Sequence, residues 1–220
     1  MALVEFVSPL HNRTPRDYIG RVTAHDKAAC ATIAKQWGQD YWDGAREHGY
    51  GGYSYDGRWL AVAEAMAAHY GLKAGDRILD VGCGKAYLLY EFTRAVPGIE
   101  VAGLDISEYG LNDAKAEVRP FLHHGHARSL PFEDNHFDFV FSLATLHNLA
   151  INDLFSAVRE IQRVGRKNKY IMVESYRNER EKANLLYWQL TCESFFAPDG
   201  WDWIYQQCGY DGDQEFIYFE

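Results

Sequence analysis

The chain has 220 residues, 47% of them hydrophobic and 15% aromatic, which predicts a single substantial core preceded by an N-terminal extension. Its formal charge of −9, with no basic block, argues against nucleic acid or an anionic membrane surface as the main partner. Four scattered cysteines suggest neither a zinc site nor a disulfide framework, and with no basic leader or long apolar run they indicate a cytoplasmic protein.

Residues 1–58 form the predicted extension and residues 59–220 the predicted α/β domain. The end of the extension, QDYWDGAREHGYGGYSYDGRW, is rich in tyrosine, tryptophan and glycine. Such rings can cover the core, or they can form a lid around a substrate cavity, with glycines that let the loop close. Both readings stay open, as does a dimer surface. An aromatic wall around a small substrate would use residues of this stretch and of a later helix: Tyr41, Trp42, Tyr53, Tyr55, Tyr187 and Trp188.

From Trp59 onward, segments of helical and strand character alternate. Helical spacing of apolar residues or suitable caps predict helices, and short apolar runs predict strands. The expected helices are 59–71, 87–96, 107–119 and 152–165, and the expected strands are 77–82, 101–105, 121–127, 137–142 and 170–175. This alternation predicts a doubly wound, mostly parallel sheet with helices on both faces. The residues after Tyr176 lie outside the alternation: a helix over 178–190 and an aromatic-rich tail.

The stretch ILDVGCGKAYLL places a glycine-rich bend between the first strand and the following helix. Glycine permits unusual backbone angles and lets the main chain touch a ligand. The P-loop pattern is absent. In the nicotinamide fingerprint, Gly82 and Gly84 fit, but Tyr87 occupies the third small position, which disfavours a dinucleotide oxidoreductase. Asp80 before the bend and Asp105 at the end of the next strand suit a ligand that carries an ammonium group and a ribose.

Four segments in order, LDVGCGKAYLL, GLDIS, HARSLPFEDNHFDFVFS and TLHNL, resemble the motifs of the class I S-adenosylmethionine-dependent methyltransferases. The resemblance runs from about Leu72 to Ser175 and implies a Rossmann-like fold, the cofactor S-adenosylmethionine and methyl transfer. It departs from the usual pattern at His126, where an acid is usual, and at Ala86, where a third glycine is often found. Ala86 is tolerable if the helix has begun there.

The resemblance also implies roles for individual residues. Asp80, Gly82 and Gly84 would hold the methionine end of the cofactor, and Asp105 the ribose. Near the adenine and the sulfonium it places Ile106, His126, Ala127, Ser142 and Leu143.

A neutral amine or hydroxyl acceptor must lose a proton when it is methylated. The candidates that follow the later strands are His147, Glu174 and Tyr176, with His147 favoured because its ordinary pKa lies near neutrality. A structural role is the alternative for each. The histidines of HHGH alternate in direction along a strand, so no metal site is expected.

These features predict N- or O-methylation of a small polar metabolite. C-methylation of a quinone or another lipophilic ring stays open, because LPFEDNHFDFVFS is also similar to methyltransferases of such rings. A further alternative is a catalytically silent protein that binds S-adenosylmethionine.

Overall fold

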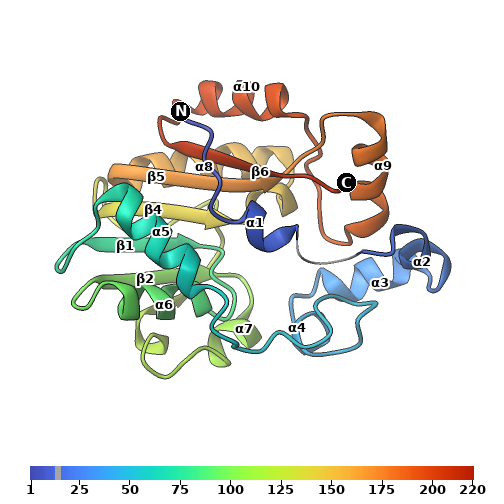
Figure 1. Cartoon of the computed structure of the whole chain (residues 1–220), viewed down its shortest axis with the longest axis horizontal. Helices are drawn as coiled ribbons and strands as arrows, with labels where there is room; N and C mark the ends of the chain where they lie inside the picture. The colour runs from blue at the N-terminus through green and yellow to red at the C-terminus, as the bar shows by residue number, and fades with distance from the viewer. Residues whose placement is uncertain (13–15) are drawn as a thin grey trace.

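The computed structural model describes residues 1–12 and 16–220, which form an α/β fold around one six-stranded sheet (Figure 1). The strand order is β3-β2-β1-β4-β5-β6, and each neighbouring pair is parallel. The strands are β1 Arg77–Val81, β2 Glu100–Asp105, β3 Leu122–His124, β4 Phe137–Leu143, β5 Gly165–Glu174 and β6 Asp213–Ile217. The doubly wound parallel sheet expected from the sequence is confirmed.

Helices cover both faces of the sheet because successive strand residues point to opposite sides. In β4, Val140 packs with α8 and α10, whereas Phe139 and Phe141 pack with α5 and α6. The larger helices are α5 Leu60–Tyr70, α6 Tyr87–Ala95, α8 Ile151–Val164, α9 Glu179–Trp188 and α10 Pro198–Cys208. The shorter ones are α1 Ser8–His11, α2 Tyr18–Thr23, α3 Lys27–Ala34, α4 Gln39–Trp42 and α7 Glu108–Asn112, with 3-10 turns at Arg119–Phe121 and Leu146–Asn148.

Two parts of the predicted element order are wrong. The helix expected over 107–119 is only the five-residue α7, because the chain leaves the helix at Asp113, whose carboxylate pairs with Lys85 at 2.8 Å. The tail after α9 does not stand outside the alternation, because α10 and β6 add another helix and a parallel strand at the edge of the sheet. Aromatic residues of this tail, such as Trp201 and Tyr205, are core residues.

The first residues of the chain contact the last strand. Leu3 forms a parallel bridge with Gln214, and the buried Glu215 carboxylate accepts the backbone N–H groups of Phe6, Val7 and Ser8 at 2.5–3.1 Å. The N-terminal extension therefore begins at the edge of the sheet that β6 forms. The division of the chain at residue 58 stays a prediction.

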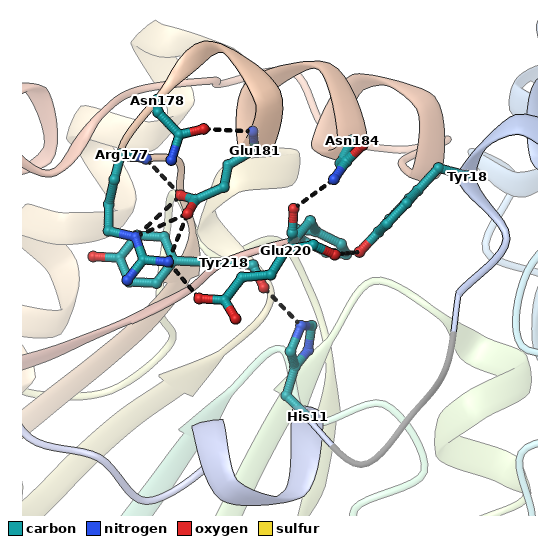
Figure 2. Close-up of polar contacts among 9 residues, drawn as sticks. His11, Tyr18, Arg177, Asn178, Glu181, Asn184, Tyr218 and Glu220 are labelled. Atoms are coloured by element: carbon teal, nitrogen blue, oxygen red, sulfur yellow. Dashed lines mark hydrogen bonds and ion pairs between the residues drawn. The ribbon is translucent and has the colours of Figure 1, made fainter.

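The C-terminal segment lies between α9 and the N-terminal helices, as Figure 2 shows. Asn184 of α9 donates to the Phe219 carbonyl at 3.0 Å, and Tyr18 of α2 donates to the Glu220 carbonyl at 3.1 Å. Arg177 pairs with the carboxylates of Glu181 and Glu220. These contacts fix α2 and α9 relative to the sheet.

Within residues 1–12 and 16–220, no helix combines the length and the apolar content that crossing a membrane requires.

Candidate functional site

The bend between β1 and α6 lies against two other segments at its glycines. Gly82 has φ +88°, and a Cβ there would lie 2.0 Å from the Thr145 hydroxyl oxygen. Gly84 has φ +54°, and its Cβ would lie 2.5 Å from the Trp42 ring. Both positions therefore need glycine for the backbone angle and for the space. Ala86 takes a left-handed φ of +53° just before α6, which begins at Tyr87 as expected, so the condition under which alanine would be tolerable, a helix already begun at residue 86, is not met.

Two buried acids flank this bend. Asp80 is 5% exposed, and no described residue donates a hydrogen bond to its carboxyl group. Burial and the neighbouring Asp105 raise the pKa of Asp80 well above its usual value. Asp105 accepts the N–H groups of Gly84 and Ser107, both at 2.7 Å, while burial raises its pKa. Asp80 thus has the unsatisfied acceptors that a bound ammonium group would fill.

Three cavities lie around the carboxyl ends of the strands. We name them by what lines them. The strand-end cavity, of about 180 Å³, lies between Asp105 at the end of β2 and Asn148 after β4. The glycine cavity, of about 100 Å³, is lined by Asp80 and the glycine bend. The arginine cavity, of about 460 Å³, contains Glu174 and four arginines, Arg16, Arg21, Arg46 and Arg58.

The three cavities adjoin one another. Tyr50 and Ala144 line all three, and Tyr53 and Met172 line both the glycine and the arginine cavity. A molecule that fills the strand-end and glycine cavities would therefore contact some of the same residues as a second molecule bound in the arginine cavity. This arrangement suits a reaction between two bound molecules at Ala144.

Residues 37–53 cover this junction, and we call them the aromatic cover. The indole N–H of Trp42 donates to the Ser107 hydroxyl at 2.8 Å, and the Trp42 ring stacks on Tyr50 with 5.3 Å between centroids. Asp43 pairs at 2.7 Å with Lys85, whose side chain is only 2% exposed and also pairs with Asp113. The aromatic cover is thus fixed to the glycine bend and to α7 by an ion pair and hydrogen bonds.

The structure brings most of the predicted cofactor residues together. Asp80, Gly82 and Gly84 line the glycine cavity, and the strand-end cavity is lined by Gly82, Asp105, Ile106, His126, Ala127 and Leu143. Ser142 is buried within β4, where its hydroxyl donates to the Val81 carbonyl at 2.7 Å, and it lines none of the three cavities.

His126 has one ring nitrogen already engaged. Its Nδ1 accepts the Arg128 N–H at 3.2 Å, and its Nε2 lies 3.7 Å from the Asp153 carboxylate. Burial lowers the pKa of His126, so the neutral ring carries its proton on Nε2. The role of His126 as an acceptor for an adenine amino group stays a prediction that this arrangement does not favour.

The three catalytic candidates lie in different surroundings. Glu174 lines the arginine cavity, accepts a hydrogen bond from Gln189, and has an Oε2 atom with no hydrogen bond from a described residue. His147 is 2% exposed and lines none of the three cavities; its Nδ1 accepts the Glu174 N–H at 3.2 Å, and burial lowers its pKa to about 3. Tyr176 lines none of the three cavities and packs beside Lys182.

Four of the six predicted aromatic residues, Tyr41, Trp42, Tyr53 and Trp188, line one or more cavities. Tyr55 instead donates to Glu91 at 2.7 Å, and Tyr187 is 39% exposed, so neither lies in the wall. The sequence reasoning missed Trp37, which stands just before the aromatic run it singled out, and Tyr50, which lies within that run. It also missed the arginines, which no local pattern marks.

Comparisons with known proteins agree with this arrangement. A family model described as a methyltransferase domain matches residues 79–173. The sterol 24-C-methyltransferase ERG6B of Gibberella zeae is 32% identical over 145 residues, which are 58% of this chain and 36% of the relative. The demethylmenaquinone methyltransferase of Staphylococcus saprophyticus is 38% identical over 98 residues, which are 42% of this chain and 41% of the relative. The chain thus spans about two fifths of the length of these curated relatives.

Among solved structures, the YcgJ protein of Bacillus subtilis superposes with a TM-score of 0.54 at 20% identity, over 66% of each chain. This similarity supports the fold alone.

Proposed function

Because the chain belongs to the class I S-adenosylmethionine-dependent methyltransferases through residues 79–173, we propose that it methylates the oxygen or nitrogen of a small polar acceptor. The observation that carries the proposal is the junction at Ala144 and Tyr50, where the cavities lined by the family's motif residues meet the separate arginine cavity. The cofactor of the family is S-adenosylmethionine. When bound, it supplies a methyl group on a sulfonium, which an aligned nucleophile displaces.

The residues of the chain fit this cofactor. The unsatisfied Asp80 carboxyl group would bind its ammonium group, and Asp105 its ribose hydroxyls. Ile106 is 46% exposed at the rim of the strand-end cavity and offers an apolar contact to a flat ring. The aromatic cover would exclude water from the reacting atoms.

We propose that Glu174, and not His147, accepts the proton that the methyl acceptor loses. Glu174 lines the arginine cavity, whereas His147 lines none of the three cavities and lies behind Glu174, with its Nε2 atom 3.5 Å from Glu174 Oε2. As the acceptor's oxygen or nitrogen gains the methyl group, its proton would pass to the Glu174 carboxylate and then to solvent; because the pKa of Glu174 is about 8, the ionised fraction that can accept this proton grows as the pH rises towards 8. The backbone hydrogen bond to the His147 ring makes His147 a positioning residue in this proposal.

C-methylation of a lipophilic ring is the second candidate, because the two curated relatives bear the names of a sterol and a demethylmenaquinone methyltransferase. The charged lining of the arginine cavity favours a polar acceptor over such a ring.

Calorimetric titration with S-adenosylmethionine, S-adenosylhomocysteine and NADH tests the proposal first. We expect the first two to bind and NADH not to bind, followed by methyl transfer to a small amine, phenol or sugar in a screen. Cofactor binding without transfer to any acceptor would favour a silent binding protein. Binding of NADH alone would overturn the assignment.

A further inference from the structure

The arginine cavity is positively charged within a protein whose formal charge is −9. Its titratable lining consists of four arginines, His11, three tyrosines and one carboxyl group, Glu174. Burial raises the pKa of Glu174 to about 8 and lowers that of His11 to about 4, so both are mainly uncharged at pH 7. Arg58 is paired with Asp56, and Arg21 and Arg46 contribute to the positive charge of the cavity.

Three of these arginines surround one indole ring. The Cζ atoms of Arg16, Arg21 and Arg46 lie 5.5, 5.3 and 5.4 Å from the centroid of Trp188. These arginines come from the N-terminal part of the chain, whereas Trp188 ends α9. Burial lowers the pKa of both Arg16 and Arg21, and the like charge of Arg46 adds to this lowering. Like charges are thus gathered at one wall, where an anion would relieve their repulsion.

Arg21 and Arg46 make no ion pair with any described carboxylate. Arg21 donates to the carbonyls of Trp188 and Arg46 at 3.3 and 2.8 Å, and Arg46 donates to the Gly49 carbonyl. The remaining N–H groups of these two side chains donate to no described residue. Carbonyl partners hold each guanidinium group in place without neutralising it, and guanidinium groups bind carboxylate and phosphate through paired hydrogen bonds.

We propose that the methyl acceptor carries an oxyanion, a carboxylate or a phosphate, which Arg21 and Arg46 bind beside Trp188. This inference rests on the proposed function and adds the chemical class of the acceptor. With its anion at Trp188, the acceptor would extend across the cavity past Glu174 towards Ala144, where the three cavities meet. The positive wall would exclude cationic amines, which the aromatic residues alone would have accommodated.

The experiment uses three probes that share one ring: phenyl phosphate, benzoate and the neutral benzamide. Each is titrated calorimetrically into the full chain saturated with S-adenosylhomocysteine, in a buffer of low chloride because salt screens charge. We expect at least one anion to bind about tenfold or more tightly than benzamide, on the scale of a hydrogen bond to a charged group. The stronger of the two anions identifies the phosphate or the carboxylate.

Variants of the arginines distinguish binding of the anion at Arg21 and Arg46 from a general electrostatic attraction to the cavity. Arg21→Gln and Arg46→Gln should each weaken binding of that anion about tenfold, and both should leave the affinity for S-adenosylhomocysteine unchanged. Arg58→Gln is the matched control, because Arg58 lines the same cavity but is already paired with Asp56.

Equal binding of all three probes, or anion binding that neither variant weakens, would overturn the inference while cofactor binding still stood. Failure of the wild type to bind S-adenosylhomocysteine would overturn the proposed function instead, and the probes would then be titrated into the free protein.

Discussion

The two halves of the candidate site have opposite charge and different origins. The cofactor half contains Asp80 and Asp105 and is built mainly by the segments at the ends of β1, β2, β3 and β4, with the aromatic cover against them. The acceptor half is lined by arginines and assembled from the N-terminal helices, the end of α9 and the last strand. The sheet fixes the cofactor half, whereas the acceptor half depends on contacts between the two ends of the chain.

This difference separates what the fold supplies from what is particular to this chain. A parallel sheet brings the ends of neighbouring strands together, so acids placed there share one cleft. Nothing in the sheet itself requires arginines at Trp188. Acceptor specificity is therefore expected to change with Arg21, Arg46 and residues 174–190, which line neither cofactor cavity, whereas the aromatic cover lines cavities of both halves.

The largest expected effect is on the pH dependence of stability. It tests whether Glu174, the carboxyl group of the acceptor half, is protonated. Burial raises the pKa of Glu174 to about 8 from its ordinary 4.5, so the folded state keeps a proton that the unfolded state releases. The stability from this proton is complete below about pH 4.5 and is lost as the pH rises to about 8. Wild type should lose up to about 5 kcal/mol over this window through Glu174, and Glu174→Gln should not.

Denaturant midpoints of both proteins at pH 5, 6.5 and 8 measure this loss. The groups that face Glu174 are Arg16, Tyr41, Tyr50, His147 and Cys192. Burial places the pKa values of the tyrosines and of Cys192 above the window, and the contribution of His147 is common to both proteins. Parallel curves for the two proteins would mean that Glu174 is ionised and neutralises part of the arginine cavity.

The second effect concerns the cofactor half. In Gly82→Ala, the new Cβ would meet Thr145, and we expect overpacking to cost about 1–3 kcal/mol of stability and to weaken S-adenosylhomocysteine binding about a hundredfold. Gly71→Ala is the control. Gly71 has a similar left-handed φ of +62° but open space around it, so only the backbone cost of about 1–2 kcal/mol applies. Equal stability and equal binding in the two variants would contradict the steric argument.

A smaller loss is expected from Asp105→Ala, which removes the acceptor for two backbone N–H groups and the proposed ribose contact. Affinity for S-adenosylhomocysteine should fall by about 1–3 kcal/mol. Calorimetry checks this, with circular dichroism to confirm folding. Unchanged affinity in a folded variant would reject the cofactor role of Asp105.

The smallest expected effect concerns the aromatic cover, which lines cavities of both halves. Asp43→Asn removes the pairing of the aromatic cover with Lys85, worth about 1 kcal/mol, and should speed amide hydrogen exchange in residues 39–53 several-fold. Asp113→Asn removes the other partner of Lys85 but leaves the aromatic cover attached. Equal rates of amide hydrogen exchange in residues 39–53 of the two variants would show that the ion pair between Asp43 and Lys85 does not hold the aromatic cover in place.

The sequence allowed site residues to be predicted where they lie in the same short stretch as a recognisable strand. Asp80, Gly82 and Asp105 could be predicted because each lies in or directly after a recognisable buried strand. His147 shows the limit of this reasoning. Its ordinary pKa suggested a base, but burial behind Glu174 removes it from the cavities, and a sequence pattern does not reveal depth. Arg21 and Arg46 could not be predicted, since their shared neighbour Trp188 is more than 140 positions away.

The pairing of residues 2–8 with β6 also has a consequence for synthesis on the ribosome. Chains elongate at about 5–20 residues per second, so Glu215 is made roughly 10–40 s after Phe6, Val7 and Ser8. Until that carboxylate has left the exit tunnel, the backbone N–H groups of Phe6, Val7 and Ser8 lack the acceptor they have in the folded protein. Strands β1 to β5 can therefore pair before residues 2–8 have their partner, and these residues take their final place only once β6 has been made.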